Sequence, residues 1–200
     1  MEHKRIRDFF DERAATWDEG RPPESIPRVR DIVAGLNIAS GSRVLDVGCG
    51  TGVLVPILEP MVGASGLLVE LDVSREMLER AKAKAAASPC LCAQADAMDL
   101  PFAVECFDWI LCYSVFPHFL DQRRGAMQLA QSLRPGGRLV VCHSQSREAI
   151  NELHRSVGDV VGGHILPPEN EMRALFRELG FEVTRIEDVP DRYVLVALKP

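Results

Sequence analysis

The chain has 200 residues, of which 46% are hydrophobic and 26% charged, a balance typical of one globular domain with a sizeable core. Its net charge of −6 argues against a broad basic face for nucleic acid. No apolar run approaches the length that spans a bilayer, and no apolar segment follows the basic residues 1–7. We therefore expect a cytoplasmic protein without a secretory signal.

Two helices are predicted before the first strand. Residues 4–19 place Ile6, Phe9 and Phe10 along one side of a helix, and the stretch from Gly20 to Pro23 ends it. Residues 25–36 carry the apolar face of a second helix. The first 40 residues are therefore expected to be helical.

The stretch at residues 44–52 organises the rest of the chain. Val44 to Val47 is a short apolar run interrupted only by Asp46, which predicts a buried parallel strand. Glycines follow at positions 48, 50 and 52, and then an apolar helix begins. Strand, glycine turn and helix form the first half of a nucleotide-binding βαβ unit, although G-x-G-x-G differs from the dinucleotide fingerprint G-x-G-x-x-G.

Strands and helices alternate through the rest of the chain. Strands are predicted at 66–72, 91–95, 109–113 and 138–142, with helices from Ser74, over 121–133, from Ser146 and after Pro168. The segments 181–189 and 192–198 predict a final hairpin. This order is typical of an α/β fold with a largely parallel sheet. Asp72 lies about 20 residues past the glycine loop, the spacing at which an acidic residue accepts ribose hydroxyls.

The run V-L-D-V-G-C-G-T-G closely resembles motif I of the class I S-adenosylmethionine (SAM)-dependent methyltransferases. The strings L-D-V-S-R-E-M-L, F-D-W-I-L-C-Y-S-V-F-P-H-F and L-R-P-G-G-R-L-V-V resemble later motifs of the methyltransferase type 11 group, and residues 9–18 resemble the methyltransferases of ubiquinone and menaquinone biosynthesis. The resemblance implies a Rossmann-like, doubly wound, seven-stranded sheet that is mostly parallel. It also implies an antiparallel C-terminal hairpin and an N-terminal helical lid.

The same resemblance implies SAM as cofactor and S-adenosylhomocysteine as product. Asp72 is the expected ribose ligand and Asp96 the expected partner of the adenine amino group. Glu70, where relatives often have glycine, is the alternative ribose ligand, and Asp72 is preferred because Ser74 fixes the register of the motif. The residues expected at the cofactor are Trp17, Asp46, Gly48, Cys49, Gly50, Thr51, Gly52, Asp72, Val73, Met77, Asp96, Ala97, Met98, Tyr113 and Ser114.

The acceptor side is expected from the segment after the fourth strand and from residues 143–170. His118 and His143 are the candidate catalytic residues, because each follows or ends a strand that should point at the cleft. A neutral imidazole there could take a proton from an acceptor. His118 is preferred, since related small-molecule methyltransferases place a histidine after this strand. The alternative for either histidine is a capping or packing role.

The implied function is transfer of the SAM methyl group to a small-molecule acceptor, and three alternatives remain. A nicotinamide-dependent oxidoreductase is disfavoured by the glycine spacing. A SAM-binding regulatory or accessory protein without turnover stays open. A metal-handling protein would use His143, His154 and His164, whose separations of eleven and ten residues match no compact ligand motif. The six cysteines form no C-x-x-C pair, so no metal site is expected.

We expect one methyltransferase domain over residues 1–200. Within it, residues 1–40 would form the lid, 41–142 the SAM-binding core, 143–170 a substrate-side insertion, and 171–200 a helix and the final hairpin. The expected partner is the small-molecule acceptor, with no nucleic acid and no membrane span. The oligomeric state stays open, with a homodimer as one alternative.

Overall fold

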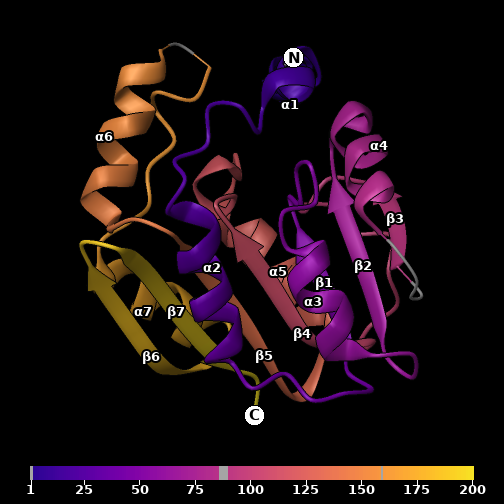
Figure 1. Cartoon of the computed structure of the whole chain (residues 1–200). Coiled ribbons are helices and arrows are strands. Elements are labelled where there is room, and N and C mark those ends of the chain that lie inside the picture. The colour runs from indigo at the N-terminus through magenta and orange to yellow at the C-terminus, as the bar shows by residue number, and fades with distance from the viewer. Residues whose placement is uncertain (1, 86–89, 159) are drawn as a thin grey trace.

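The computed structural model describes residues 2–85, 90–158 and 160–200 (Figure 1), so residue 1 of the predicted lid and residue 159 of the predicted insertion lie outside it. Most predicted boundaries agree to within two residues, but the first helix divides in two and the fifth strand begins earlier than predicted. The helices are α1 (Glu2–Arg13), η1 (Ala14–Thr16), α2 (Ser25–Ala34), α3 (Val55–Val62), α4 (Arg75–Lys84), η2 (Phe116–His118), α5 (Gln122–Ser132), α6 (Arg147–Val157) and α7 (Glu169–Glu178). The strands are β1 (Arg43–Val47), β2 (Leu67–Asp72), β3 (Cys90–Gln94), β4 (Phe107–Tyr113), β5 (Leu133–His143), β6 (Glu182–Val189) and β7 (Arg192–Leu198).

The strands form one seven-stranded sheet in the order β3-β2-β1-β4-β5-β7-β6. Strands β1 to β5 pair in parallel, whereas β7 runs antiparallel to both β5 and β6. The predicted doubly wound, mostly parallel sheet with an antiparallel C-terminal hairpin is confirmed.

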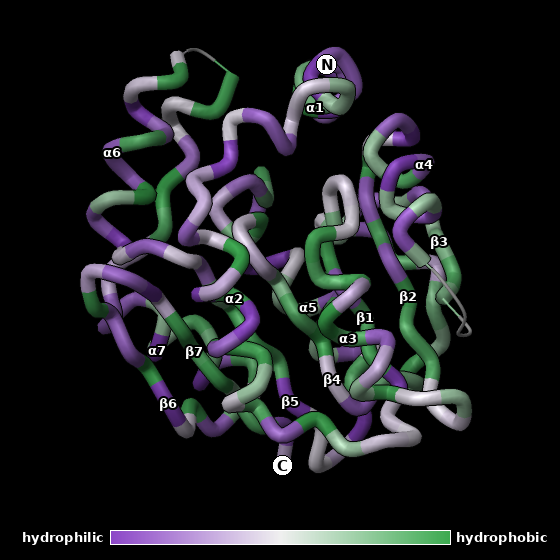
Figure 2. The backbone as a smooth tube through the Cα atoms, viewed as in Figure 1, coloured by the Kyte–Doolittle hydropathy of each residue, from purple (hydrophilic) through white to green (hydrophobic). Residues whose placement is uncertain are grey.

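Helices cover both faces of this sheet. Side chains alternate along each strand, so each strand contributes apolar residues to both faces, and each face packs against helices. Leu45 and Val47 of β1 belong to the core layer that includes α5 and α7, whereas Val44 belongs to the opposite layer with α2 and α3. The backbone is hydrophobic along the central strands and more hydrophilic along much of the outer helices (Figure 2). Among the described residues, no helix is both long and apolar enough to cross a membrane.

The direction of winding reverses between β1 and β4, the two adjacent central strands. From β1 the chain continues outward through β2 and β3, and it then returns to β4 on the other side of β1. Open α/β sheets bind ligands beyond the carboxyl ends of the strands at such a reversal. The glycine loop after β1 and the segment after β4 both lie there.

Candidate active site

A cavity of about 530 Å³ lies beyond the carboxyl ends of β1, β2 and β4. Loops after these strands form its walls, together with residues from α1 and η1, and Figure 1 shows α1 above this edge of the sheet. Of the residues expected at the site, Asp46, Gly52 and His143 are not on its wall. The expected residues on the wall are Trp17, Gly48, Cys49, Gly50, Thr51, Asp72, Val73, Met77, Asp96, Ala97, Met98, Tyr113, Ser114 and His118.

The glycine loop needs glycine because neighbouring elements approach it closely. All three of its glycines have positive φ. A Cβ added at Gly48 would lie 2.1 Å from Cγ2 of Val115, and one at Gly52 would lie 2.7 Å from the Cα of Ala81 on α4. Gly52 therefore packs closely against α4 and is not on the cavity wall. A Cβ added at Gly50 would lie 3.9 Å from its nearest neighbour, Nε1 of Trp17, so the backbone there stays approachable.

Asp72 lies at the end of β2 and is held by backbone N–H groups. Its Oδ2 accepts from the N–H of Gly50 at 2.9 Å, and its Oδ1 accepts from the N–H of Ser74 at 2.8 Å. Burial raises the pKa of Asp72 to about 6 even though these hydrogen bonds oppose that rise. Glu70, two residues earlier, is fully buried and off the cavity wall. Of these two acids, Asp72 is therefore the one on the cavity wall.

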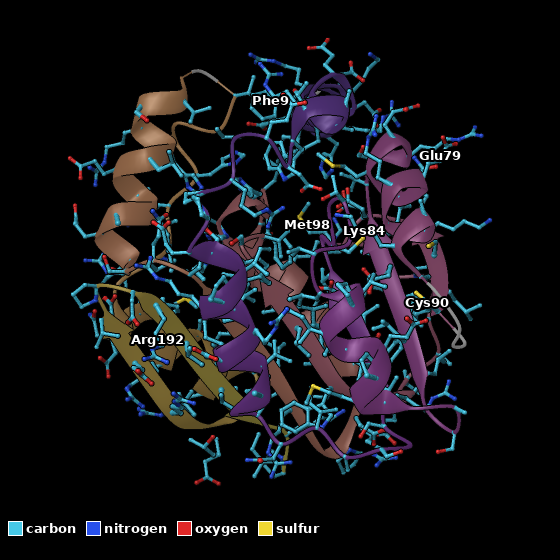
Figure 3. All side chains as sticks on the ribbon, viewed as in Figure 1. Phe9, Glu79, Lys84, Cys90, Met98 and Arg192 are labelled. Atoms are coloured by element: carbon cyan, nitrogen blue, oxygen red, sulfur yellow. The ribbon has the colours of Figure 1, made fainter. Side chains whose placement is uncertain are left out.

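Asp96 follows β3 and has two roles in the structure. Its Oδ1 accepts from the N–H of Met98 at 2.9 Å, and its Oδ2 lies 2.6 Å from Nδ1 of His3 on α1. A ligand amino group at Asp96 would share or replace the contact with His3. Ala97 and Met98, the next two residues, are buried and supply apolar surface to the cavity wall. Met98 is labelled in Figure 3.

Two aromatic side chains of the N-terminal segment lie on the cavity wall, and we call this pair the aromatic roof. It consists of Phe10 on α1 and Trp17 after η1, with ring centroids 5.4 Å apart. The ring of Phe10 also lies 5.6 Å from that of His118. The roof therefore connects the N-terminal segment to the segment after β4.

Acidic residues attach this N-terminal segment to α4 and the glycine loop. Asp18 accepts from the hydroxyl of Thr51 at 2.7 Å and from Nζ of Lys84, labelled in Figure 3, at 2.8 Å. Asp11 accepts from the hydroxyl of Ser74 at 2.5 Å, next to the start of α4. Both acids lie in the N-terminal motif at 9–18, but Thr51, Ser74 and Lys84 are 33 or more residues away from them, so sequence spacing did not predict these contacts.

The end of β4 has an unusual backbone. Ser114 is exposed and has a φ of 56°, a left-handed conformation that costs free energy outside glycine. Its N–H donates to the carbonyl of Cys142 on β5 at 3.0 Å. Next to it, the hydroxyl of Tyr113 donates to Oγ of Ser144 at 3.2 Å. These contacts hold the loops after β4 and β5 together at the cavity.

His143, one of the two candidate catalytic residues, lies on the side of β5 that faces away from the cavity. The residue is 3% exposed, its ring lies 6.3 Å from that of Tyr193, and it is not on the cavity wall, whereas the next residue, Ser144, is. Burial, with a smaller effect of His154, lowers the pKa of His143 to about 3. His143 is therefore a neutral, buried side chain and not a base facing the acceptor.

Asp46 is also displaced from its expected place. It is 1% exposed and is the direct partner of Glu70 between β1 and β2. Burial, then the charges of Glu70 and Asp46, raise the pKa of the neighbouring Cys49 thiol well above its ordinary value, so this thiol stays protonated. Cys49 can contact a ligand but is no nucleophile.

His118 is the catalytic candidate that does line the cavity, and the structure gives it partners that sequence reasoning did not identify. Its Nδ1 lies 3.0 Å from Nδ1 of His164, and its ring centroid lies 4.7 Å from that of His154. Burial, followed by the neighbouring histidines, lowers the pKa of His118 well below its usual range, so the ring is neutral at pH 7. Among the described residues, no group of three or more His, Cys, Asp or Glu has a metal-binding arrangement.

The geometry of this site agrees with comparisons to known proteins. A family model described as a methyltransferase domain matches residues 45–141. The 27-O-demethylrifamycin SV methyltransferase of Amycolatopsis mediterranei is 31% identical over 192 residues, which cover 90% of this chain and 67% of that protein. The chain belongs to the class I SAM-dependent methyltransferases. The predicted family is therefore confirmed.

A further curated relative and a solved structure extend the comparison. The O-methyltransferase resE of Aspergillus sclerotiorum is 31% identical over 175 residues, which are 81% of this chain and 63% of resE. Magnesium protoporphyrin IX methyltransferase of Synechocystis, solved with bound S-adenosylhomocysteine, shares the fold with a TM-score of 0.72 at 20% identity, covering all of both chains. The chain thus spans about three fifths of the length of some curated relatives, 63% and 59% in two cases.

Proposed function

We propose that this chain binds SAM in the cavity and transfers its methyl group to a small-molecule acceptor, with S-adenosylhomocysteine as the second product. The observation that carries the proposal is the carboxylate of Asp72 on the cavity wall, held by the N–H of Gly50 in the glycine loop. Each carboxylate oxygen can accept more than one hydrogen bond, so Asp72 keeps capacity for two ribose hydroxyls. Membership of the family supports the same cofactor.

The residue types on the wall fit the parts of SAM. The glycine loop, with open backbone at Gly50, would hold the amino-acid end, and Asp72 would hold the ribose. Asp96 would accept from the adenine amino group, and the apolar surface of Ala97 and Met98 would contact the ring. When bound, SAM supplies a methyl group already activated by its sulfonium.

The protein must then align the acceptor and exclude water. The aromatic roof of Phe10 and Trp17, which lies on the cavity wall, would cover bound SAM and shield it from solvent. The imidazole of His118, on the wall and neutral, would take a proton from the acceptor where the acceptor carries one. We infer that residues 1–40 act as the lid of a single domain.

The acceptor class we propose is a small molecule with an acidic hydroxyl, such as a phenol. Some relatives are named O-methyltransferases, which supports oxygen as the methylated atom. Residues 143–170 would form the acceptor side, since Ser144, Gln145 and Leu153 from this segment are on the cavity wall. A neutral histidine can deprotonate a phenol more readily than an aliphatic alcohol, because the phenol is the stronger acid.

Two measurements test the proposal. Calorimetry should show binding of SAM and S-adenosylhomocysteine but not of NAD, and methyl-labelled SAM should transfer label to a panel of phenols, catechols and hydroquinones. Binding of NAD without SAM would contradict the cofactor. SAM binding without label transfer to the panel or to a cell-extract metabolite pool would instead favour an accessory SAM-binding protein.

A further inference from the structure

Three histidines from distant parts of the chain meet at one side of the cavity. His118 ends η2, His154 lies on α6, and His164 lies in the segment between α6 and α7. The Nδ1 atoms of His118 and His164 are 3.0 Å apart, and the rings of His118 and His154 have centroids 4.7 Å apart. Only His118 of the three is on the cavity wall.

The backbone that carries His164 is fixed on both sides. The carbonyl of His164 accepts from Nδ1 of His154 at 2.5 Å, so His154 must carry its proton on Nδ1. Asn151 on α6 forms two hydrogen bonds with the backbone of Leu166, at 3.1 and 2.8 Å. Nε2 of Gln122 on α5 donates to the carbonyl of Ile165 at 2.9 Å. The backbone at residues 164–166 is therefore held by α5 and α6, and this places the imidazole of His164 within reach of His118.

This contact limits the tautomers of His118. At 3.0 Å, one of the two Nδ1 atoms must carry a hydrogen and the other must accept it. If His118 carries the hydrogen, its Nε2 is bare and can accept a proton; if His164 carries it, His118 has Nε2–H and cannot act as a base. A catalytic base needs a third group that sets this tautomer, a role a carboxylate fills in other enzymes.

We propose that His164 is the positioning residue of this site and holds His118 in the Nδ1–H tautomer, so that His118 Nε2 takes the proton of the acceptor hydroxyl. This inference rests on the proposed function. In the proton step the acceptor O–H bond breaks, its electron pair stays on oxygen, and the proton bonds to Nε2. The neutral imidazole becomes a cation and the acceptor an anion, with the Nδ1–H of His118 still donated to His164.

The proposal predicts the protonation of each histidine nitrogen, which ¹⁵N NMR reads directly. The full chain with ¹⁵N-labelled histidine and bound S-adenosylhomocysteine should show His118 as a single Nδ1–H tautomer. His164→Phe, which cannot accept a hydrogen bond, should convert His118 to a mixture or to the Nε2–H form. His164→Asn, whose side-chain oxygen can occupy the position of Nδ1, should restore the Nδ1–H form. Ile165→Ala is the matched control, because its side chain is half exposed and its neighbour His164 is kept.

The functional arm uses labelled SAM with catechol as the acceptor. His164→Phe should lower turnover, and the decrease should not exceed the roughly 10²–10⁴-fold that a positioned base supplies. The affinity for S-adenosylhomocysteine should stay unchanged. His164→Asn should restore part of the lost turnover. An Nε2–H tautomer of His118 in the wild-type chain would overturn the proposal, as would an unchanged His118 tautomer in His164→Phe. The wild-type measurement decides even where His164→Phe fails to fold. Failure to bind SAM or its product would instead overturn the proposed function.

Discussion

Asp46 on β1 and Glu70 on β2 are direct partners in the parallel register, and both side chains are withdrawn from solvent. The side chains of Asp46 and Glu70 are within hydrogen-bonding reach of each other, and Glu70 is also within reach of the thiol of Cys49. Burial raises the pKa of Glu70 to about 7, although these hydrogen bonds oppose the rise. Burial and then the charge of Glu70 raise the pKa of Asp46 well above its usual range. The neutral forms are favoured because a buried charge is costly.

Glu70→Gln should therefore stabilise the fold at alkaline pH. The folded-state pKa of Glu70, about 7, is above the ordinary value of 4.5, so the native state holds this proton more tightly. The free energy of unfolding should fall as pH rises from about 4.5 to about 7 and stay lower above that. At pH 8, thermal denaturation should give Glu70→Gln a higher Tm than the wild type. This difference in Tm should be smaller at pH 5. Exposed Glu79→Gln is the control, and equal offsets at both pH values would contradict the prediction.

Asp72→Ala should weaken SAM binding by about 1.5–3 kcal/mol, the range for hydrogen bonds to a charged group. The reason is loss of the carboxylate on the cavity wall, together with its support of Gly50. Calorimetry with SAM measures the effect. Glu70→Gln is the matched control, since Glu70 lies two residues away and off the wall. A larger loss in the control would mean that Asp72 is not the ribose ligand.

Asp18→Asn should loosen the N-terminal segment over the cavity. Burial alone would raise the pKa of Asp18, but hydrogen bonds from Lys84, Thr51 and Arg21 lower it to about 2. Because the folded-state pKa is depressed, this stabilisation is present above about pH 4 and is lost as pH falls toward 2. The global effect should stay within about 1 kcal/mol, as the pair is half exposed.

Stopped-flow measurement of SAM release tests this lid attachment. Asp18→Asn should release SAM several-fold faster at pH 7, whereas Glu19→Gln, an exposed neighbour, should behave as the wild type. Identical release rates in all three chains would show that Asp18 does not hold the lid closed.

His118→Gln should lower turnover by roughly 10²–10⁴-fold, the contribution of a positioned general base, and leave SAM affinity unchanged. His143→Gln should leave the proton step intact, because His143 is not on the cavity wall, and should change stability instead. Labelled methyl transfer to catechol and calorimetry with SAM separate the two effects. Equal losses of turnover and SAM affinity in His118→Gln would make His118 a structural residue.

Local patterns in the sequence were sufficient to predict the sheet, and the family resemblance added most of the expected residues that line the cavity. Apolar runs of strand length, the alternate glycines at 48, 50 and 52, and the acid at 72 are properties of neighbouring residues, and their spacing implies their geometry. Asp72 and Asp96 reach the cavity because each follows or ends a parallel strand, and such ends meet at one edge of the sheet.

Only the tertiary structure decided which histidines lie at the cavity and which of them contact one another. His143 ends β5 and Ser144 follows it, and the side chains of these consecutive residues point to opposite sides. His143 therefore lies off the cavity wall, whereas Ser144 is on it. His118 and His164 are 46 residues apart, and they meet because α5 and α6 hold the backbone at 164–166 beside η2. No local periodicity encodes such a contact, since it depends on how separate elements pack.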